Sequence, residues 1–508
     1  MQLSIQIRKL FLDGSLVRAM ERYGRPVQMD VTSPTRREFL MALGAVAVLL
    51  AMSSAGFGDD KGGQKPNIII ILADDLGWAD VGYHGARIST PSIDRLAREG
   101  VRLENFHACP LCSPTRAGLM TGRWPIRYGM GESVITPWRK YGRQKSERTL
   151  ADLLAKAGYE RRGAIGKWHL GHYKEKLLPL NRGFTHFYGH YNGAFDYFTH
   201  KREGQLDWHR NFETCRDEGY STDLIGREAV RFIEESPVDK PFFLYVPFNA
   251  PHLPLQAKEQ DIAKYNDIDN EKKRIYAAMV DSMDQAIGKI LDALDVRGIA
   301  ENSFVLFFSD NGGTSYGDNR PWRGGKGSVY EGGVRVPAAL RWPAGVAGGR
   351  SVDAMMGYID VYPTIKRVAG ITDPDPNPLD GRDMLDVIRR KAEAPKRDWF
   401  SYIAQGSPDK TAVCDGTWKL IVLGGNVLDM TLERAIRVGD SKAKPSVELF
   451  HLERDPGERT NLATEHPDIV AGLLERLKEF RRLKISGVPD YREGRKGFKA
   501  PKDWVIAQ

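Results

Sequence analysis

Cysteine is scarce in this sequence, with four residues among 508. They are Cys109, Cys112, Cys215 and Cys414. So few cysteines exclude a disulfide framework, although a single Cys215–Cys414 bridge stays open. Each thiol therefore needs its own interpretation.

The sequence also lacks a strong excess of charge of one sign. Its 74 basic and 66 acidic residues leave a formal net charge of +8. This small excess fits an acidic substrate and equally fits an ordinary solvated surface. No basic stripe is interleaved with aromatic residues, so nothing indicates nucleic-acid binding. The hydrophobic fraction of 41% is that of a globular protein, and the chain is long enough for two domains.

The apolar run near the N-terminus, Phe39–Met52, is too short to span a bilayer comfortably. It follows a twin-arginine export pattern, Thr35–Leu40, and precedes small residues suited to cleavage, Ser53–Ala55. We therefore expect residues 1–55 to be a signal segment, with Met29 as a hypothetical start. The mature protein is expected to be periplasmic or extracellular, without a stable membrane span. A short membrane anchor is the alternative.

Four apolar segments have the continuous hydrophobicity of strands that are buried on both faces of a sheet. Each runs into polar residues at its carboxyl end. The four are Asn67–Ala73, Ala164–Gly166, Phe242–Val246 and Phe304–Phe308. In open α/β sheets ligands bind at that edge, so the pattern predicts a site there.

Helices are expected between these strands, over Leu150–Ala157 and Arg274–Leu294, and from Pro91 with Thr90 as the N-cap. The alternation predicts an α/β catalytic domain over residues 66–393, with a large mixed, mostly parallel sheet sandwiched by helices.

The pattern of predicted elements changes after about residue 394. Trp399–Ile403 and Trp418–Val422 are predicted strands, Asp415–Gly416 is a hairpin turn, and Pro467–Leu483 is an amphipathic helix. Residues 394–508 are therefore expected to form a smaller α+β domain with an antiparallel sheet.

Asp74, Asp75, Asp310 and Asn311 form an oxygen-rich set after two of the predicted strands. Hard cations such as Ca²⁺ and Mg²⁺ prefer oxygen ligands. Either motif alone is more often a turn or a helix cap. Both together, each after a buried strand, favour a metal site.

Cys112 lies just before Pro114, a residue suited to the first turn of a helix. The free N–H groups of such a turn attract anions, and Arg116 is one turn further along the same face. Cys112 is therefore a reactive centre, an inert core thiol, or one half of a redox or zinc pair with Cys109.

Lys167, His169, His252 and Lys326 supply cations and a proton donor to the same region. Lysines can hold the peripheral oxygens of a tetrahedral oxyanion, and a histidine can protonate its leaving group. Each residue alone is more often structural, so the prediction depends on their shared position near strand ends.

The segment Cys112–Arg123, CSPTRAGLMTGR, resembles the signature of the type I sulfatases. Further motifs follow in the family's order and extend the resemblance from about Pro66 to Ala463. They include Ala73–Gly77, Gly166–Gly171, Pro251–His252, Ser309–Gly313, Gly325–Gly327 and Glu448–Pro456. Within the family, Gly171–Tyr173 and Arg182–Phe184 resemble the arylsulfatase B, or N-acetylgalactosamine-4-sulfatase, group.

The resemblance implies an alkaline-phosphatase-like fold and hydrolysis of a sulfate ester on a sulfated carbohydrate or an aryl sulfate. It also implies that a formylglycine-generating enzyme oxidises Cys112 to formylglycine before export. The implied ligands of a single Ca²⁺ are Asp74, Asp75, residue 112, Asp310 and Asn311.

The remaining roles also come from the resemblance. Arg116 would orient residue 112, and His169 would assist it. Lys167 and Lys326 would hold the sulfate, and His252 would protonate the leaving alcohol. Two departures stand out, since Thr115 replaces the commoner serine and one extra residue precedes Lys167 within residues 158–167.

Two alternatives remain open. A phosphomonoester or phosphonate-ester hydrolase could use the same scaffold, because phosphate and sulfate esters share tetrahedral geometry. A non-catalytic protein that binds sulfated glycans could keep Cys112 unmodified.

Overall fold

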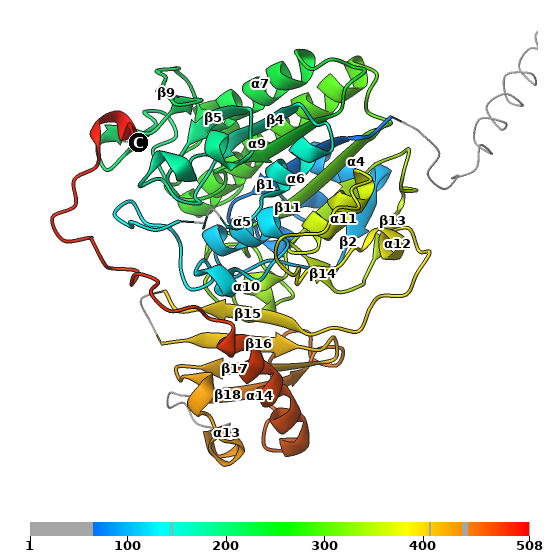
Figure 1. Cartoon of the computed structure of the whole chain (residues 1–508), viewed down its shortest axis with the longest axis vertical. Coiled ribbons are helices and arrows are strands. Elements are labelled where there is room, and N and C mark those ends of the chain that lie inside the picture. Colours follow the sequence, from blue (N-terminus) through cyan, green and yellow to red (C-terminus); the bar gives the residue numbers. More distant parts are fainter. Residues whose placement is uncertain (1–63, 143, 145, 406–407, 439–445, 507–508) are drawn as a thin grey trace, which may run out of the picture. The chain divides into compact units, whose positions relative to one another are not determined.

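β1 (Asn67–Ala73) lies near the centre of a ten-stranded sheet in the computed structural model (Figure 1). The structure describes residues 64–142, 144, 146–405, 408–438 and 446–506. The predicted signal segment and its twin-arginine pattern lie outside these residues. Along the described chain, no helix has both the length and the apolar character needed to cross a membrane.

The middle of the sheet is a block of parallel strands that flank β1 on both sides. These are β11 (Ser303–Ser309), β10 (Phe242–Pro247), β4 (Arg161–Lys167) and β5 (His186–His190). β1 pairs in parallel with β10 and β11, β10 with β4, and β4 with β5. Because these strands run in one direction, their carboxyl ends meet at one edge.

Shorter strands complete the two sides of the sheet. Antiparallel β12 follows β11, so the sheet is mixed but mostly parallel, as predicted. The outer strands are β12 (Ala338–Arg341), β2 (Val101–Leu103) and β13 (Arg350–Val352) on one side, and β8 (His209–Arg210) and β9 (Glu213–Thr214) on the other. Two separate two-stranded ladders are β3 (Phe106–His107) with β14 (Met356–Gly357), and β6 (Lys201–Arg202) with β7 (Gln205–Leu206).

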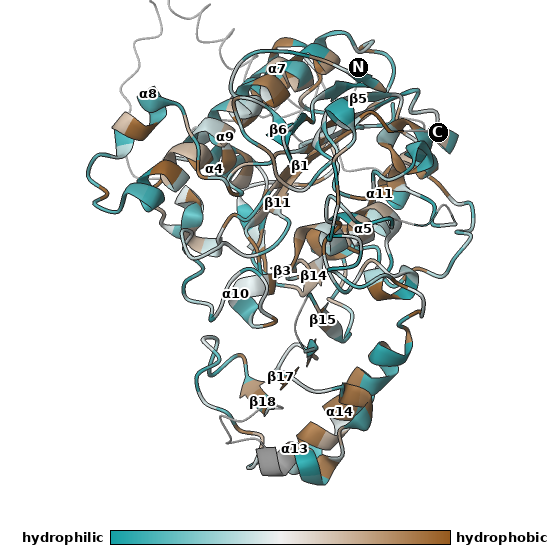
Figure 2. Ribbon diagram, turned by 90° about the vertical axis from the view of Figure 1, so that its left-hand side faces the viewer, coloured by the Kyte–Doolittle hydropathy of each residue, from teal (hydrophilic) through white to brown (hydrophobic). Residues whose placement is uncertain are grey.

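Alternate side chains of β1 enter two different hydrophobic cores. Ile68 and Ile70 pack in the core that contains residues of α5 (Cys112–Thr121), α6 (Leu150–Lys156) and α11 (Val361–Val368). Ile69 and Ile71 pack in the other core, with residues of α4 (Pro91–Glu99), α7 (Ser221–Glu234) and α9 (Glu271–Val296). Figure 2 shows the hydrophobic colouring of β1 and β11 between these layers. Burial on both faces explains the unbroken apolar run in the sequence.

A second sheet, entirely antiparallel, follows in the chain. Its strands are β15 (Trp399–Ile403), β16 (Lys410–Cys414), β17 (Trp418–Leu423) and β18 (Ser446–His451). Leucines of α14 (Pro467–Arg482) pack against this sheet in a core of their own. The predicted fold class is therefore confirmed, while the boundaries 66–393 and 394–508 stay a prediction. The remaining helices are α8 (Glu259–Ile262), α10 (Glu331–Val334), α12 (Leu385–Ile388) and α13 (Leu432–Val438).

Local signals predicted one turn and one helix start correctly. The predicted hairpin turn joins β16 to β17, and Gly416 has a positive φ of 103° there. Thr90 occupies the N-cap position of α4, as predicted, but its side chain makes no capping hydrogen bond to the first turn. Its hydroxyl instead accepts from Gly82 N at 2.7 Å, and Asp284 of α9 accepts from Ser92 N and Ile93 N.

Candidate active site

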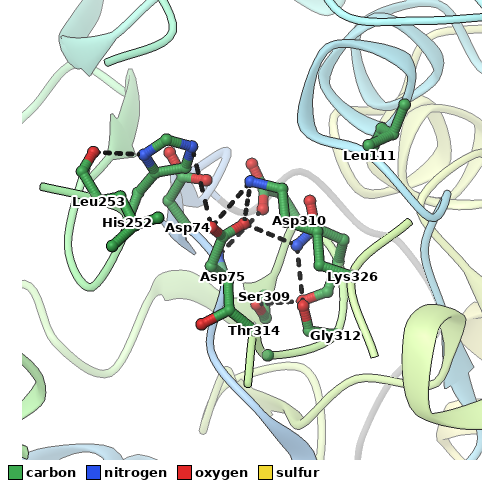
Figure 3. Close-up of polar contacts among 12 residues, drawn as sticks. Asp74, Asp75, Leu111, His252, Leu253, Ser309, Asp310, Gly312, Thr314 and Lys326 are labelled. Atoms are coloured by element: carbon green, nitrogen blue, oxygen red, sulfur yellow. Dashed lines mark hydrogen bonds and ion pairs between the residues drawn. The ribbon is translucent and has the colours of Figure 1, made fainter. Parts of the chain in front are cut away.

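Two pairs of polar residues meet where β1 and β11 end (Figure 3). Asp74–Asp75 follow β1 and Asp310–Asn311 follow β11, and the two strands are in register up to Ala73 opposite Ser309. All four side chains are buried, with relative exposures of 0–1%. Parallel pairing therefore assembles the predicted oxygen-rich set.

Cys112 joins this set from the first residue of α5. Its Sγ and one carboxylate oxygen from each of Asp74 and Asp310 all lie within 4.8 Å of one another. Burial raises the pKa of the Cys112 thiol, despite the opposing charge of Lys167. The side chain is 1% exposed, so an unmodified thiol at this position is mainly protonated and shielded from solvent.

The alternative of a Cys109–Cys112 redox or zinc pair finds no support in the contacts. Cys109 Sγ donates a hydrogen bond to Tyr358 Oη at 3.0 Å, away from the acidic residues around Cys112. All four cysteines are free thiols, so the possible Cys215–Cys414 bridge is not formed. Thr115, the departure from the commoner serine, accepts a hydrogen bond from Cys109 N at 2.8 Å and fits its place in α5.

Arg116 connects α5 to two strands of the sheet. Its Nε and Nη2 donate to Asp310 Oδ2 at 2.9 and 2.7 Å, and its Nη1 donates to the Lys167 carbonyl at 3.0 Å. The side chain has no exposed surface. This fork fixes the start of α5 against the Asp310 carboxylate, because a guanidinium donates along a rigid plane.

The two predicted lysines each contact one of the strand-end aspartates. Lys167, the last residue of β4, is hydrogen-bonded to Asp74, and Lys326 Nζ donates to Asp75 at 2.7 Å. β4 pairs with β5 without interruption from Gly163 to Lys167. The extra residue noted in the sequence therefore does not disturb the strand that presents Lys167.

The buried carboxylates influence one another strongly. Burial and the nearby charge of Asp74 raise the pKa of Asp310. Burial would also raise the pKa of Asp74, but Lys167, His252 and Arg116 outweigh it and hold that pKa below its usual range. A cation among these oxygens would favour the ionised form of both groups.

Two oxygens of the set have no hydrogen-bond partner in the described part of the chain, although both are buried. They are Asp74 Oδ1 and Asn311 Oδ1. Buried polar atoms are normally satisfied, so these two oxygens are available to a cation. The four side chains offer carboxylate and amide oxygens, which are suitable ligands for Ca²⁺ or Mg²⁺.

His252 lies beyond β10 and faces the carboxylates from the more open side. Its Nε2 is 3.8 Å from Asp75 Oδ2, and its Nδ1 is 2.6 Å from the Leu253 carbonyl. A carbonyl accepts only, so Nδ1 carries a proton and Nε2 points toward the site. Burial, followed by Lys326, lowers the pKa of His252 to about 4.

His169 is tied to Ser113, the residue after Cys112, and to Ile135, neither of which the sequence singled out. Ser113 Oγ donates to the His169 carbonyl at 2.9 Å and accepts from Ile135 N at 3.0 Å. The Ile135 carbonyl lies 2.9 Å from His169 Nε2. Burial lowers the pKa of His169 well below its usual value, so the ring is neutral and Nε2 donates to that carbonyl.

Ser309 is a further residue whose role the sequence analysis missed. Its hydroxyl accepts from Leu76 N at 3.0 Å and donates to the Asn311 carbonyl at 2.8 Å. It therefore fixes both strand-end loops. Its position in the Ser309–Gly313 motif was the available signal.

The chain matches known families over most of its length. Residues 66–371 match the model described as Sulfatase, and residues 324–427 match N-sulphoglucosamine sulphohydrolase, C-terminal. Mouse arylsulfatase J is 34% identical, covering 84% of this chain and 77% of its own length. Human N-acetylgalactosamine-6-sulfatase is 33% identical, covering 85% and 89%. The finer resemblance to the 4-sulfatase group stays a prediction.

Solved structures agree with this match. The crystal structure of Ps i-CgsB superposes with a TM-score of 0.77 at 30% identity, covering 85% of this chain and 96% of that one. Ps i-CgsB has also been crystallised in complex with k-i-k-neocarrahexaose. The phosphonate monoester hydrolase of Agrobacterium radiobacter, at 18% identity and a TM-score of 0.58, shares the fold alone.

Proposed function

This chain belongs to the sulfatase family, and from that premise we propose that it hydrolyses a sulfate ester on a sulfated carbohydrate, with residue 112 as the reactive centre. The observation that carries this proposal is the position of Cys112 Sγ beside Asp74 and Asp310, at the edge where the parallel strands end. Lys167, His252 and Lys326 surround the same point from three other segments.

The proposed metal is one Ca²⁺ per chain, held by Asp74, Asp75, Asp310, Asn311 and residue 112. The two unpartnered oxygens of Asp74 and Asn311 support this assignment. The ion would supply positive charge for the anionic ester and for the nucleophile. Arg116 holds Asp310 in place for that purpose, since two of its N–H groups donate to the same carboxylate oxygen.

We assign to residue 112 a conversion from cysteine to formylglycine by a formylglycine-generating enzyme. The hydrated aldehyde would supply a hydroxyl nucleophile for sulfur and a second hydroxyl for release of sulfate. The neutral His169 and the Ser113 hydroxyl keep the start of α5 in position beside it. The twin-arginine pattern supports export after this modification, to the periplasm or beyond.

Lys167 and Lys326 neutralise the peripheral oxygens of the sulfate, which stabilises the charge that develops as the ester bond breaks. His252 protonates the leaving oxygen from Nε2, because Nδ1 is already engaged by the Leu253 carbonyl. A bound anionic ester raises the fraction of imidazolium by placing negative charge beside the ring.

The decisive test combines mass spectrometry with turnover. The tryptic peptide that contains residue 112 is expected to carry an aldehyde in protein isolated from the exporting cell. Wild type is expected to hydrolyse an aryl sulfate faster than the matching aryl phosphate, and Cys112→Ala is expected to hydrolyse neither. Equal activity in Cys112→Ala would overturn the mechanism. A preference for the phosphate would favour a phosphoester hydrolase, and sulfated-glycan binding without turnover would favour a non-catalytic protein.

A further inference from the structure

The loop that follows β11 lines a cleft leading away from Lys326. The cleft has a volume of about 490 Å³, and its lining runs from Gly313 through Asp318 to Ser328. Lys326 itself is hydrogen-bonded to Asp75, and Figure 3 shows it beside the carboxylates with Thr314 nearby. Lys326 therefore belongs both to the lining of this cleft and to the proposed site.

A second cleft, of about 460 Å³, adjoins the first. It is lined by Arg320–Arg323 of the same loop and by Gly457–Arg459. Arg320 and Trp322 line both clefts, so the two spaces meet at these side chains. Together they give the site room for more than one sugar, since pockets for drug-sized ligands occupy about 300–1,000 Å³.

Basic side chains outnumber acidic ones in the two clefts. The basic residues are Arg320, Arg323, Lys326 and Arg459, against Asp318 and the buried Glu458. The first three are each paired with a carboxylate, Arg320 with Asp318, Arg323 with Glu448 and Lys326 with Asp75. Arg459 is exposed and forms no ion pair with any other described residue. The guanidinium of Arg459 therefore supplies the positive charge that attracts an anionic group, and the low exposure of Glu458 keeps its charge from the solvent side.

Arg320 is exposed and pairs with Asp318 of the same loop. Asp318 accepts from its Nε at 2.9 Å and from its Nη2 at 2.5 Å. Asp318 is in turn fixed by the bond from its own N–H to Asp80. One edge of the guanidinium is therefore occupied, and the Nη1 edge is left to bind an oxyanion.

Trp322 forms a rigid aromatic wall between the clefts. The guanidinium carbon of Arg335 lies 4.2 Å from the centre of one indole ring, and Trp78 packs edge-on at 5.6 Å. An aromatic surface suits the apolar C–H face of a sugar ring, with polar groups around it to fix orientation.

From these features we propose that the two clefts bind the sugar units next to the one being desulfated, with a second sulfate group held by Arg320 and Arg459. The substrate class is then a sulfated oligosaccharide or polysaccharide chain and not a free sulfated monosaccharide. This inference rests on the proposed function, because it takes the centre at residue 112 as the point of hydrolysis.

The test measures how well oligosaccharides compete with 4-nitrophenyl sulfate for turnover. The competitors are hexasaccharides and disaccharides prepared from carrageenan and from chondroitin 6-sulfate. Wild type is expected to bind a hexasaccharide of at least one series about tenfold more tightly than its disaccharide, a difference of about 1.4 kcal/mol. In the double variant Arg320→Ala/Arg459→Ala this preference is expected to fall to about twofold or less.

Arg87→Ala is the matched control, because Arg87 is 80% exposed and its ion pair with Asp267 lies outside both clefts. It is expected to keep the wild-type preference. The proposal is overturned if wild type shows no preference for the longer chain in either series, or if the double variant keeps it. If wild type does not hydrolyse the aryl sulfate, the proposed function fails. Calorimetric binding of the same oligosaccharides to wild type and to the double variant then tests separately whether the clefts bind them.

Discussion

Asn311 donates a hydrogen bond from its side-chain amide to Asp75 Oδ1 at 2.8 Å, across the ends of two adjacent strands. This bond turns the amide oxygen of Asn311 to the opposite side, where it has no partner among the described residues. This one contact therefore restrains Asp75 and leaves the Asn311 oxygen available to a cation.

Removing that oxygen is expected to weaken calcium binding. Ca²⁺ at about 100 times its dissociation constant is expected to stabilise wild type by about 2.7 kcal/mol, and Asn311→Ala by clearly less. Thermal melts with and without a calcium chelator measure both. Asn266→Ala, at an exposed position, is the control. An unchanged calcium response in Asn311→Ala would exclude the assignment.

His252 is expected to matter most for esters with poor leaving groups. His252→Gln should lower kcat by roughly 10²–10⁴-fold on a sulfated sugar, because an alcohol leaves slowly without a proton. The loss should be much smaller on 4-nitrophenyl sulfate, whose phenolate leaves readily. Steady-state rates on both substrates give the comparison, and equal losses would argue against a general acid.

A methyl group at Gly193 is expected to displace His169. A Cβ at this position would lie 2.4 Å from the His169 ring, closer than real contacts allow. Gly193→Ala should therefore reduce kcat by about tenfold or more, since small displacements at an active site cost about that much. In Gly472→Ala the added Cβ meets nothing within 4 Å, so this variant serves as the control. Full activity in Gly193→Ala would show that the position of His169 is not critical.

Asp284 is expected to make stability depend on pH. Burial raises its pKa from the usual 3.8 to about 6, so the folded chain holds the proton more tightly than the unfolded chain. The extra stability from this proton is complete below pH 3.8 and is lost as pH rises through about 6. The melting temperature of wild type should fall relative to Asp284→Asn between about pH 4 and pH 7. A constant difference between the two proteins would contradict the raised pKa.

Lys419 is expected to be essential for the join between the second sheet and the main one. It lies on β17 and contacts Glu331 of α10 at 2.7 Å and Glu458 at 2.9 Å, all three being buried. Lys419→Met removes the ammonium group that two buried carboxylates share, although Glu331 still contacts His107 and Arg335. This loss should cost about 3–5 kcal/mol in chemical denaturation. Lys240→Met, at an exposed ion pair with Glu160, should change stability little. A similarly small effect of Lys419→Met would show that the carboxylates take up protons at low cost.

The sequence predicted the strands closely because burial on both faces leaves a local signal. The observed range of β1 equals the predicted one, and β15 does as well. The polar residues after those strands were also predictable, since parallel pairing brings carboxyl ends to one edge. The carboxylate that accepts from the first turn of α4 was not predictable, because Asp284 lies on a helix nearly 200 residues away in the sequence.

The contacts that refine the site are likewise long-range. Nothing local in the sequence indicates that Ile135 would bond to His169, or that Gly457–Arg459 would share a cleft with Trp322. Such pairings depend on loop geometry, and loops carry little periodicity from which to predict it.

The burial of Cys112 would set a time limit on its proposed conversion to formylglycine in the cell. β11, which supplies Asp310 to close the site, ends about 200 residues after Cys112 in the chain. At a synthesis rate of about 5–20 residues per second, roughly 10–40 s pass between the emergence of the two segments. A maturing enzyme that must reach the thiol thus competes with the completion of the sheet, and slower translation between these segments would raise the yield of active protein.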